Sequence, residues 1–298
     1  MKKNSIAVIG AGKWGSALHF ALSQKQEVFI TSRTKKDIKN FVDLETALDC
    51  EYLIIAIPAQ EIRAWLEKNF KFKGQKILVA SKGIEAHTGK FLNEIYEEFV
   101  PNKNIGFISG PSFAAEVIKA LPAAIVINSK SKKLYEAFEP FFPTFLKTYY
   151  SKDVIGAEIA GAYKNVLAIA SGICDGLKLG NNARASLISR GLVEMERFGR
   201  FFGSKKSTFV GLSGAGDLFL TASSTMSRNY RVGLGLAQGK ELNVILEELG
   251  EVAEGVKTAE AIYFLSYENS IYTPIANEVK KILEGKNPID SLKDLLKS

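Results

Sequence analysis

The amino-acid sequence predicts an α/β protein in which a doubly wound, mostly parallel sheet is followed by an all-α domain. Over the first 151 residues, short β-rich runs alternate with helical patterns, and a glycine-rich turn follows the first run. From residue 152 to residue 298, helical periodicity dominates. Alternating strands and helices are typical of a parallel sheet covered by helices on both faces. We therefore expect two domains, 1–151 and 152–298.

The first expected strand, Ser5–Ile9, runs directly into Gly10-Ala-Gly-Lys-Trp-Gly15, and a helix is expected over Trp14–Gln24. A G-x-G-x-x-G turn between a strand and a helix is the fingerprint of a Rossmann-like dinucleotide-binding domain. Gly10 allows the tight turn, Gly12 lets the backbone approach a pyrophosphate, and Gly15 lets the helix pack on the sheet. The helix N-terminus then faces the phosphates. The sequence thus predicts a site for NAD or NADP.

Further strands are expected at Glu27–Thr31, Tyr52–Ile57, Lys76–Ser81, Ile105–Ser109, Ala123–Asn128 and Lys147–Tyr150. Pro58 and Pro111 each follow a strand and are expected at the first position of a helix, where a proline lacks only an unused N–H. Ser151 is expected to cap the first helix of the second domain. Glycines predict breaks between the later helices, near 172–180, 203, 211–216 and 233–239.

The composition favours a soluble, globular, cytoplasmic protein. Of the 298 residues 46% are hydrophobic, enough for large cores. The longest apolar run, Leu53–Ala59, is too short to span a bilayer, and the start of the chain lacks the apolar region of a signal peptide. Cys50 and Cys174 form no disulfide framework and no metal-ligand spacing, so we expect a reducing compartment and no metal. The net charge of +7 is interspersed with acids, which favours anionic small molecules over nucleic acid.

Cofactor choice in such domains depends on the end of the second strand, where an acid binds the 2′-hydroxyl of NAD and an arginine accommodates the 2′-phosphate of NADP. Here the strand ends Ile30-Thr-Ser-Arg-Thr-Lys-Lys36, with no acid. We expect NADP(H) to be used at least as well as NAD(H), with Arg33 as the main contact.

Lys164 stands out because the surrounding segment, Gly156–Gly172, is almost wholly small and apolar. On a helix its axial neighbours cannot pair with an ammonium. One interpretation is an ordinary lysine that reaches out to water. The other is a lysine in a cleft, whose pKa burial lowers until it can exchange a proton with a substrate oxygen near neutral pH.

Two segments follow strands, where active sites of open α/β sheets lie. Lys82 directly follows one of these strands, and Gly83 permits a close turn. Its alternative is a plain surface lysine. In Gly110-Pro-Ser-Phe-Ala-Ala-Glu-Val117, Pro111 and Ser112 are expected to begin a helix whose amides can bind an anion or an oxygen. Its alternative is simple helix capping by a serine.

In the helical half, Gly211–Asn229 combines three glycines, Asp217, a hydroxyl cluster and Ser227-Arg228-Asn229. The planar guanidinium of Arg228 suits a phosphate. Asp217 can orient and balance an amine such as that of Lys164 or Lys82. The alternative makes Asp217 a helix cap after a glycine loop and Arg228 a solvated surface residue.

Together these segments resemble the bacterial NAD(P)-dependent glycerol-3-phosphate dehydrogenases over nearly the full length. The motifs that carry the resemblance are Gly10-Ala-Gly-Lys-Trp-Gly15, Ser81-Lys-Gly-Ile-Glu85, Gly110–Val117, Lys164-Asn-Val-Leu-Ala-Ile-Ala170, Gly214-Ala-Gly-Asp-Leu218, Ser227-Arg-Asn229 and Val252-Ala-Glu-Gly-Val256. Two features depart from the family pattern. Lys13 stands where a small hydroxyl residue is usual, which gives the pyrophosphate turn a charge contact instead, and the segment from Arg33 to Asp43 is shorter.

The resemblance implies that Lys164 is the proton acceptor, that Lys82 contacts both cofactor and substrate, and that Asp217 assists them. It implies further substrate contacts from Gly110, Ser112, Asp217, Ser227, Arg228 and Asn229. Cofactor contacts are implied for Trp14, Arg33, Ala114, Arg228, Val252 and Glu254. The family commonly forms homodimers.

The expected reaction is reversible hydride transfer between sn-glycerol 3-phosphate and dihydroxyacetone phosphate, supplying glycerol 3-phosphate for phospholipid synthesis. A hydroxyacid or ketopantoate type reductase is an alternative, since such enzymes also join a dinucleotide domain to a helical one with a catalytic lysine. A carboxylate substrate does not by itself require Ser227-Arg228-Asn229 beside Lys82. A dinucleotide sensor without catalysis would have no need of Lys164 and Asp217.

Overall fold

The computed structural model describes residues 2–250 and 252–297 and divides the chain into two compact units. The first, which we call the sheet unit, comprises Met1–Ser81 and Leu92–Val154. The second, the helical unit, comprises Lys82–Phe91 and Ile155–Ser298. The expected boundary after residue 151 therefore differs from this division in two respects. Val154 still packs in the core of the sheet unit, and Lys82–Phe91 leaves the sheet unit to join the helical one.

Seven strands form one sheet in the order β2-β1-β3-β4-β5-β6-β7. All neighbouring pairs are parallel except β5 and β6, which are antiparallel, so the predicted mostly parallel sheet is confirmed. The strands are β1 Lys2–Ile9, β2 Phe29–Thr31, β3 Cys50–Ile55, β4 Lys76–Val79, β5 Ile105–Ser109, β6 Ala123–Asn128 and β7 Leu146–Ser151. Two of these, β5 and β6, have the predicted bounds, and the others shift at one or both ends.

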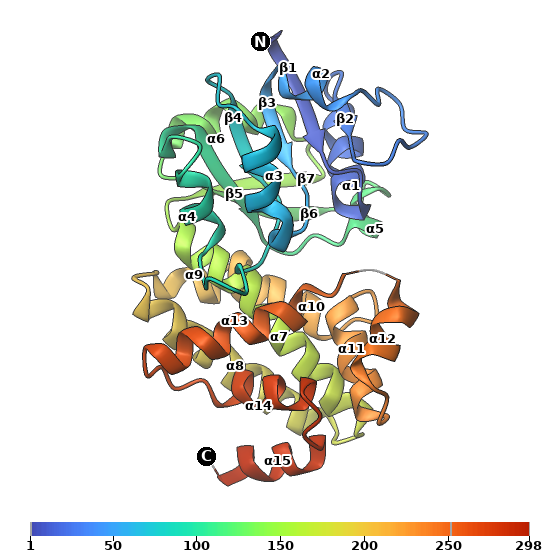
Figure 1. Cartoon of the computed structure of the whole chain (residues 1–298), viewed down its shortest axis with the longest axis vertical. Helices are drawn as coiled ribbons and strands as arrows, with labels where there is room; N and C mark the ends of the chain where they lie inside the picture. Colours follow the sequence, from blue (N-terminus) through green and yellow to red (C-terminus); the bar gives the residue numbers. More distant parts are fainter. Residues whose placement is uncertain (1, 251, 298) are drawn as a thin grey trace. The chain divides into compact units, whose positions relative to one another are not determined.

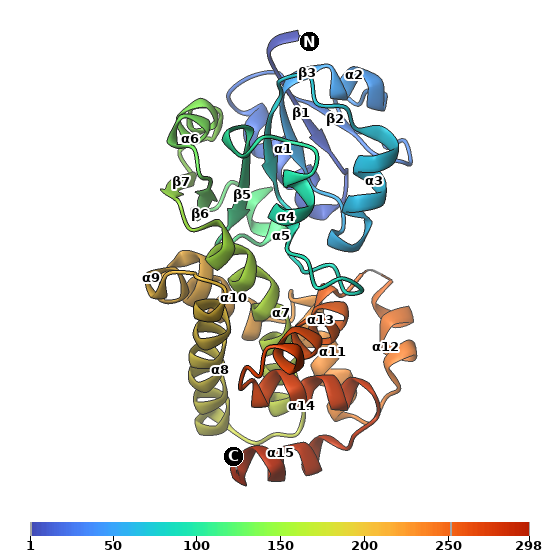
Figure 2. The same ribbon diagram turned by 60° about the vertical axis from the view of Figure 1, so that its left-hand side comes forward.

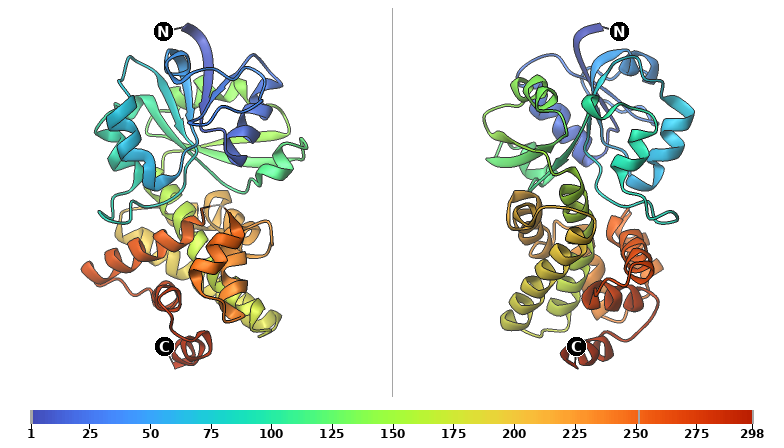
Figure 3. Two further views of the ribbon diagram at one scale, coloured as in Figure 1. Left: turned by 45° about the vertical axis from the view of Figure 1, so that its right-hand side comes forward. Right: turned by 90° about the vertical axis from the view of Figure 1, so that its left-hand side faces the viewer.

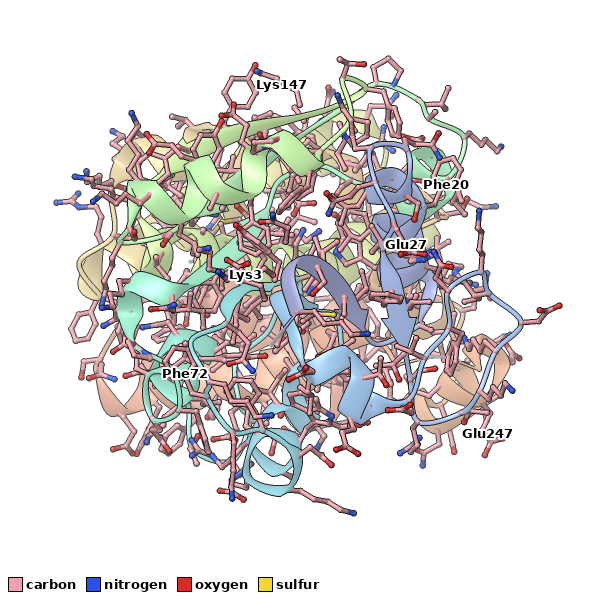
Figure 4. All side chains as sticks on the ribbon, turned by 90° about the horizontal axis from the view of Figure 1, so that it is seen from above. Lys3, Phe20, Glu27, Phe72, Lys147 and Glu247 are labelled. Carbon is pink, nitrogen blue, oxygen red and sulfur yellow. The ribbon has the colours of Figure 1, made fainter. Side chains whose placement is uncertain are left out.

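Alternate residues of the central strands β1, β3 and β4 enter two different cores, which explains why helices cover both faces of the sheet (Figure 1). On β1, for example, Ile6 and Val8 pack with one core and Ala7 and Ile9 with the other. Helices α1, α5 and α6 contribute to the first core, and α2, α3 and α4 to the second. Their bounds are α1 Lys13–Ser23, α2 Leu44–Leu48, α3 Ile62–Asn69, α4 Leu92–Glu97, α5 Ala114–Val117 and α6 Lys132–Phe138. Figure 4 looks down on this unit from above, with Lys3 on β1 and Phe20 on α1 labelled.

Contrary to the prediction, neither proline is the first residue of a helix, because the helical segment begins one or more residues after it. Pro58 precedes a short 3₁₀ turn, η1 Ala59–Glu61, which then leads into α3. Pro111 and Ser112 lie in a bend, and α5 begins only at Ala114 after Phe113. The prediction that Pro111 and Ser112 begin a helix with free amides is therefore wrong. Three further short 3₁₀ and π segments are η2 Asn102–Asn104, η3 Glu139–Phe141 and η4 Leu212–Gly216.

Among the described residues, the helical unit contains nine α-helices. The first residue of α7, Val154, still belongs to the sheet unit. They are α7 Val154–Gly176, α8 Asn181–Phe201, α9 Lys206–Val210, α10 Asp217–Ala222, α11 Arg228–Ala237, α12 Leu242–Leu249, α13 Glu254–Glu268, α14 Pro274–Leu283 and α15 Pro288–Lys297. The two longest, α7 and α8, lie side by side (Figures 2 and 3). Ser151 ends β7 instead of capping α7, although its hydroxyl accepts from the amide of Asp153 at 3.1 Å.

The breaks expected near 172–180, 203 and 233–239 are present, since α7 ends at Gly176, α8 at Phe201 and α11 at Ala237. The first glycine of two of these ranges lies inside a helix and lets two helices approach closely. Gly172 lies within α7 and Gly233 within α11. A Cβ on Gly172 would lie 2.1 Å from the carbonyl oxygen of Tyr230, and one on Gly233 would lie 2.1 Å from that of Ile169. These glycines therefore serve a backbone-to-backbone crossing. The break expected near 211–216 separates α9 from α10, and the π-helix η4 occupies most of it.

Within residues 2–250 and 252–297, every helix is too short or too polar to cross a membrane.

Candidate active site

One carboxylate and two ammonium groups form a buried cluster in the helical unit. Asp217 Oδ1 accepts from Lys164 Nζ at 2.6 Å, and Asp217 Oδ2 accepts from Lys82 Nζ at 2.7 Å. Asp217 is 1% exposed and Lys164 is 8% exposed. The structure thus brings together the three residues expected to be catalytic, although they are 53 and 135 positions apart in sequence. Lys164 does not reach out to bulk water, and Asp217 is not merely a helix cap.

Each member of the cluster is positioned by a distinct element. Lys164 lies in the middle of α7, and Asp217 is the first residue of α10, directly after η4. Lys82 is carried by Lys82–Phe91, where a bridge between Ile84 and Phe91 closes the segment. A Cβ on Gly161 would lie 3.3 Å from Lys82 Cγ, so this glycine of α7 leaves room for the lysine stem.

The electrostatics of the cluster shift the pKa values of Lys164 and Asp217 in a way that distinguishes the two groups. Burial lowers the pKa of Lys164, the Asp217 carboxylate raises it in part, and the Lys82 ammonium lowers it again, so the pKa falls from 10.5 to about 8. Burial alone would raise the pKa of Asp217, but the ammonium groups of Lys164 and Lys82 outweigh that effect and keep this pKa below its usual value. Asp217 therefore stays ionised while Lys164 can be an ammonium or an amine near neutral pH.

Thr221 is a member of this cluster that the sequence analysis missed. Its hydroxyl accepts from Lys164 Nζ at 2.9 Å and donates to the main-chain oxygen of Asp217 at 2.6 Å. Thr221 lies four residues after Asp217, a spacing that places both side chains on one face of α10. This spacing is the feature of the sequence from which Thr221 could have been predicted. With Thr221 and Asp217 as acceptors, the lysine side chain is held in a single direction.

Ser227, Arg228 and Asn229 form the start of α11. The Ser227 hydroxyl accepts from the amide of Tyr230 at 3.3 Å and caps the helix. Asn229 Oδ1 accepts from the amide of Gly255 at 3.0 Å, which ties α11 to the first turn of α13 beside Glu254. Val252, just before α13, is 53% exposed.

A second set of contacts fixes α11 against α7. Tyr230 donates from its hydroxyl to Asp175 Oδ2 at 2.6 Å, and Arg184 Nη1 donates to the same oxygen at 3.0 Å. Together with the crossing of Gly172 and Gly233, these bonds set the position of Ser227-Arg228-Asn229 relative to the helix that carries Lys164.

The glycine turn of the sheet unit meets the steric requirements of a dinucleotide site. Gly10 has φ +106°, and its Cβ would lie 2.3 Å from the carbonyl oxygen of Ala56. A Cβ on Gly15 would lie 1.8 Å from the oxygen of Gly10, whereas a Cβ on Gly12 would meet nothing within 4 Å. The first and third glycines therefore allow close packing, and the second leaves open space before α1, which begins at Lys13 and Trp14. A bound pyrophosphate fits this arrangement.

The other expected residues of the sheet unit follow two strands. Arg33 is exposed in the loop after β2. Gly110, with φ +102°, follows β5, and Ser112 donates from its hydroxyl to the oxygen of Gly110 at 3.2 Å. Ala114 begins α5. The cluster of Lys82, Lys164 and Asp217 belongs to the helical unit and does not include these residues.

A doubly wound sheet with a G-x-G-x-x-G turn, joined to a helical unit in which two lysines share a buried aspartate, defines the class of NAD(P)-dependent dehydrogenases with an all-α second unit. Comparison with known proteins specifies the family. The profile "NAD-dependent glycerol-3-phosphate dehydrogenase N-terminus" matches residues 30–135, and the profile of the corresponding C-terminus matches residues 153–294. The chain belongs to the NAD(P)-dependent glycerol-3-phosphate dehydrogenase family.

Curated relatives and a solved structure agree with this assignment. The chain is 64% identical to the glycerol-3-phosphate dehydrogenase (NAD(P)+) of Sulfurimonas denitrificans, over 98% of this chain and 99% of the relative. It is 63% identical to that of a Nitratiruptor species, over 98% and 97% of the two chains. The crystal structure of glycerol-3-phosphate dehydrogenase from Coxiella burnetii has 32% identity and a TM-score of 0.89, covering 99% of both chains. Family membership decides against the ketopantoate-type alternative.

Proposed function

We propose that this protein catalyses reversible hydride transfer between sn-glycerol 3-phosphate and dihydroxyacetone phosphate, supplying glycerol 3-phosphate for phospholipid synthesis. The observation that carries the proposal is the single carboxylate of Asp217 between the ammonium groups of Lys164 and Lys82, at 2.6 and 2.7 Å. When bound, the nicotinamide supplies or accepts the hydride at its C4.

Lys164 carries the proton that accompanies this hydride. In the oxidation of glycerol 3-phosphate, its neutral amine removes the proton of the C2 hydroxyl. In the reduction of the ketone, its ammonium returns a proton to the carbonyl oxygen. A pKa of about 8 suits both directions, because both protonation states are accessible near neutral pH. Asp217 and Thr221 accept hydrogen bonds from Lys164 and hold its nitrogen in place.

Lys82 supplies a positive charge that Asp217 cannot fully balance. With both lysines protonated, the cluster carries two positive charges and one negative charge. An anionic substrate compensates the excess charge, and its developing alkoxide does so as well. The N-terminal residues Ser227, Arg228 and Asn229 of α11 hold the substrate phosphate, with Gly110 and Ser112 as further substrate contacts. Anchoring the phosphate orients C2 toward the reacting groups.

NAD(P) is the cofactor, as the family requires. We assign its pyrophosphate to Gly10, Gly12, Lys13, Trp14 and Gly15, and further contacts to Lys82, Ala114, Arg228, Val252 and Glu254. Arg33 accommodates the 2′-phosphate, so that NADP(H) is used at least as well as NAD(H). The observation behind this preference is a second strand that ends without an acid up to Lys36.

An absorbance assay at 340 nm tests the proposed reaction. Reduced cofactor should be consumed with dihydroxyacetone phosphate and left unchanged with ketopantoate. Activity on ketopantoate alone would assign the protein to the alternative class of reductase. No oxidation of the cofactor with either ketone, in protein that binds it, would favour a sensor.

Kd values of NADPH and NADH for wild type and Arg33→Ala test the preference for NADP(H). Equal relative losses of affinity for the two cofactors would count against Arg33 as the contact of the 2′-phosphate.

We further propose a cytoplasmic homodimer. The two buried cysteines, Cys50 and Cys174, are free thiols, which suits a reducing compartment. Sedimentation of the purified chain tests the dimer, and a monomer at micromolar concentration would exclude it.

A further inference from the structure

We propose that Lys36 determines cofactor specificity by binding the 2′-phosphate of NADP(H) together with Arg33. This inference rests on the dinucleotide site proposed above and adds a residue to it. Lys36 Nζ donates a hydrogen bond to the carbonyl oxygen of Ala11 at 2.5 Å. Ala11 is the residue between the first two glycines of the turn. The ammonium of Lys36 is therefore held against the turn that receives the dinucleotide.

The backbone that carries Lys36 is fixed by its own hydrogen bonds. The amide of Ile38 donates to the oxygen of Lys36 at 3.0 Å, and Ile30 and Asn40 are joined by a bond of 3.1 Å. Phe41 continues this pairing with a bridge to Ile30. Ile38 and Phe41 also pack against the core of the sheet unit. This loop, drawn in blue beside β2 in Figure 1, thus presents Lys36 from a defined position.

The position of the ammonium matches the place where this fold distinguishes NADP from NAD. The group that contacts the ribose 2′-substituent lies at the end of the second strand. Here that end is joined to the glycine turn, because the amide of Gly10 donates to the oxygen of Thr31 at 2.8 Å. Lys36 bonds to the next residue of the turn, Ala11, so its charge lies where the two segments meet.

The chemistry of this loop favours a phosphate over a hydroxyl. Between Ser32 and Lys36 it contains three basic residues, Arg33, Lys35 and Lys36, and no acid. An ammonium has three protons, and Ala11 accepts one of them, so two protons of Lys36 can be donated to phosphate oxygens. The 2′-phosphate carries nearly two negative charges, whereas the 2′-hydroxyl of NAD carries none and would be served better by an acid.

Binding measurements on the purified chain test this role without relying on turnover. Calorimetric or fluorescence Kd values are determined for NADPH and NADH, and for the fragments 2′,5′-ADP and 5′-ADP, with wild type, Lys36→Met and Lys39→Met. Lys39 lies on the same loop, is exposed, and makes the same change of net charge when replaced. Lys36→Met should raise the Kd of NADPH and 2′,5′-ADP about ten- to a hundredfold. For NADH and 5′-ADP the rise should be under about threefold. Lys39→Met should change all four values by less than about threefold.

A variant that retains the positive charge tests whether the charge of Lys36 recognises the 2′-phosphate. Lys36→Arg should keep most of the preference for the phosphorylated ligands. Equal losses for both members of each pair in Lys36→Met, or no loss at all, would overturn the assignment to the 2′-phosphate. A loss that Lys39→Met reproduces would overturn it too, because net charge alone would then suffice. If wild type bound neither NADPH nor NADH, the proposed function itself would fail, whereas a selective loss in Arg33→Ala without one in Lys36→Met would remove Lys36 alone.

Discussion

Two glycines, Gly12 in the sheet unit and Gly233 in the helical unit, serve opposite purposes. In the sheet unit, a Cβ on Gly12 would point into open space, which leaves room for a ligand. In the helical unit, a Cβ on Gly233 would lie 2.1 Å from the oxygen of Ile169, so the space is already filled by another helix. The charges differ in the same way. The sheet unit presents its cations on an exposed loop, whereas the helical unit buries Lys164 and Asp217. The glycine turn of the sheet unit is therefore suited to binding a ligand, and the buried cluster of the helical unit to proton transfer.

The largest expected effect separates these two tasks. Lys164→Met should lower kcat by about 10²–10⁴-fold, because general acid–base catalysis contributes that much. The Kd of NADPH should change little, since Lys164 is not among the residues assigned to the cofactor. Steady-state kinetics and calorimetry measure the two quantities. Lys206→Met, an exposed lysine of α9, is the matched control and should behave as wild type. A variant that folds and retains more than about half of its turnover would show that Lys164 is not the proton carrier.

The next effect concerns the substrate phosphate. Arg228→Ala should remove charge-assisted hydrogen bonds of about 1.5–3 kcal/mol, which lowers kcat/KM for dihydroxyacetone phosphate roughly ten- to more than a hundredfold. Dihydroxyacetone, which has no phosphate, should be affected far less. Some loss of NADP(H) affinity is expected because Arg228 is also assigned to the cofactor. Equal proportional losses for the two ketones would exclude Arg228 as the phosphate anchor.

A pair of alanine substitutions tests the comparison of glycines directly. Gly233→Ala should destabilise the protein by about 1–3 kcal/mol, because backbone atoms of α7 must move away. That cost corresponds to a fall in Tm of several degrees. Gly12→Ala should leave Tm nearly unchanged, since its Cβ meets nothing within 4 Å, while raising the Kd of NADPH about tenfold or more. Thermal melts and cofactor titrations of both variants measure the contrast. A lower Tm for Gly12→Ala than for Gly233→Ala would contradict the proposed difference between the two glycines.

The same comparison explains what the sequence could predict. Strands such as β5 and β6 were predicted with their observed bounds because apolar runs between turn residues are a local signal. The glycine turn was equally local. The breaks expected near 172–180 and 233–239 are confirmed, since α7 ends at Gly176 and α11 at Ala237. The sequence could not show that Gly172 and Gly233 themselves lie inside helices, because a glycine in a turn and a glycine under a crossing helix look alike until the partner helix is known.

The site was predicted where residue chemistry alone is informative. A lysine among small apolar residues indicated Lys164, and Asp217 was an available carboxylate, so their pairing could be anticipated. Thr221 and Lys36 could not be selected in the same way. Each acts through a contact that depends on how its helix or loop folds back, and hydroxyls and lysines of similar appearance occur throughout the chain.

The smallest expected effect is a shift in pH dependence. Oxidation of glycerol 3-phosphate needs the amine form of Lys164, so kcat/KM should rise with pH up to about 8 and then level off. Reduction of dihydroxyacetone phosphate needs the ammonium form, so it should decline above about 8. The substrate phosphate ionises near pH 6 and does not produce either limb.

Asp217→Asn removes the charge that raises the pKa of Lys164 and leaves the neighbouring ammonium of Lys82. The oxidation limb of this variant should therefore move to lower pH, at reduced overall rate. Profiles of kcat/KM between pH 6 and pH 10 measure the shift. Below the pKa the rate rises about tenfold per pH unit, so a shift of one unit changes the rate at a fixed pH about tenfold. A limb that stayed near pH 8 in Asp217→Asn would belong to a group other than Lys164.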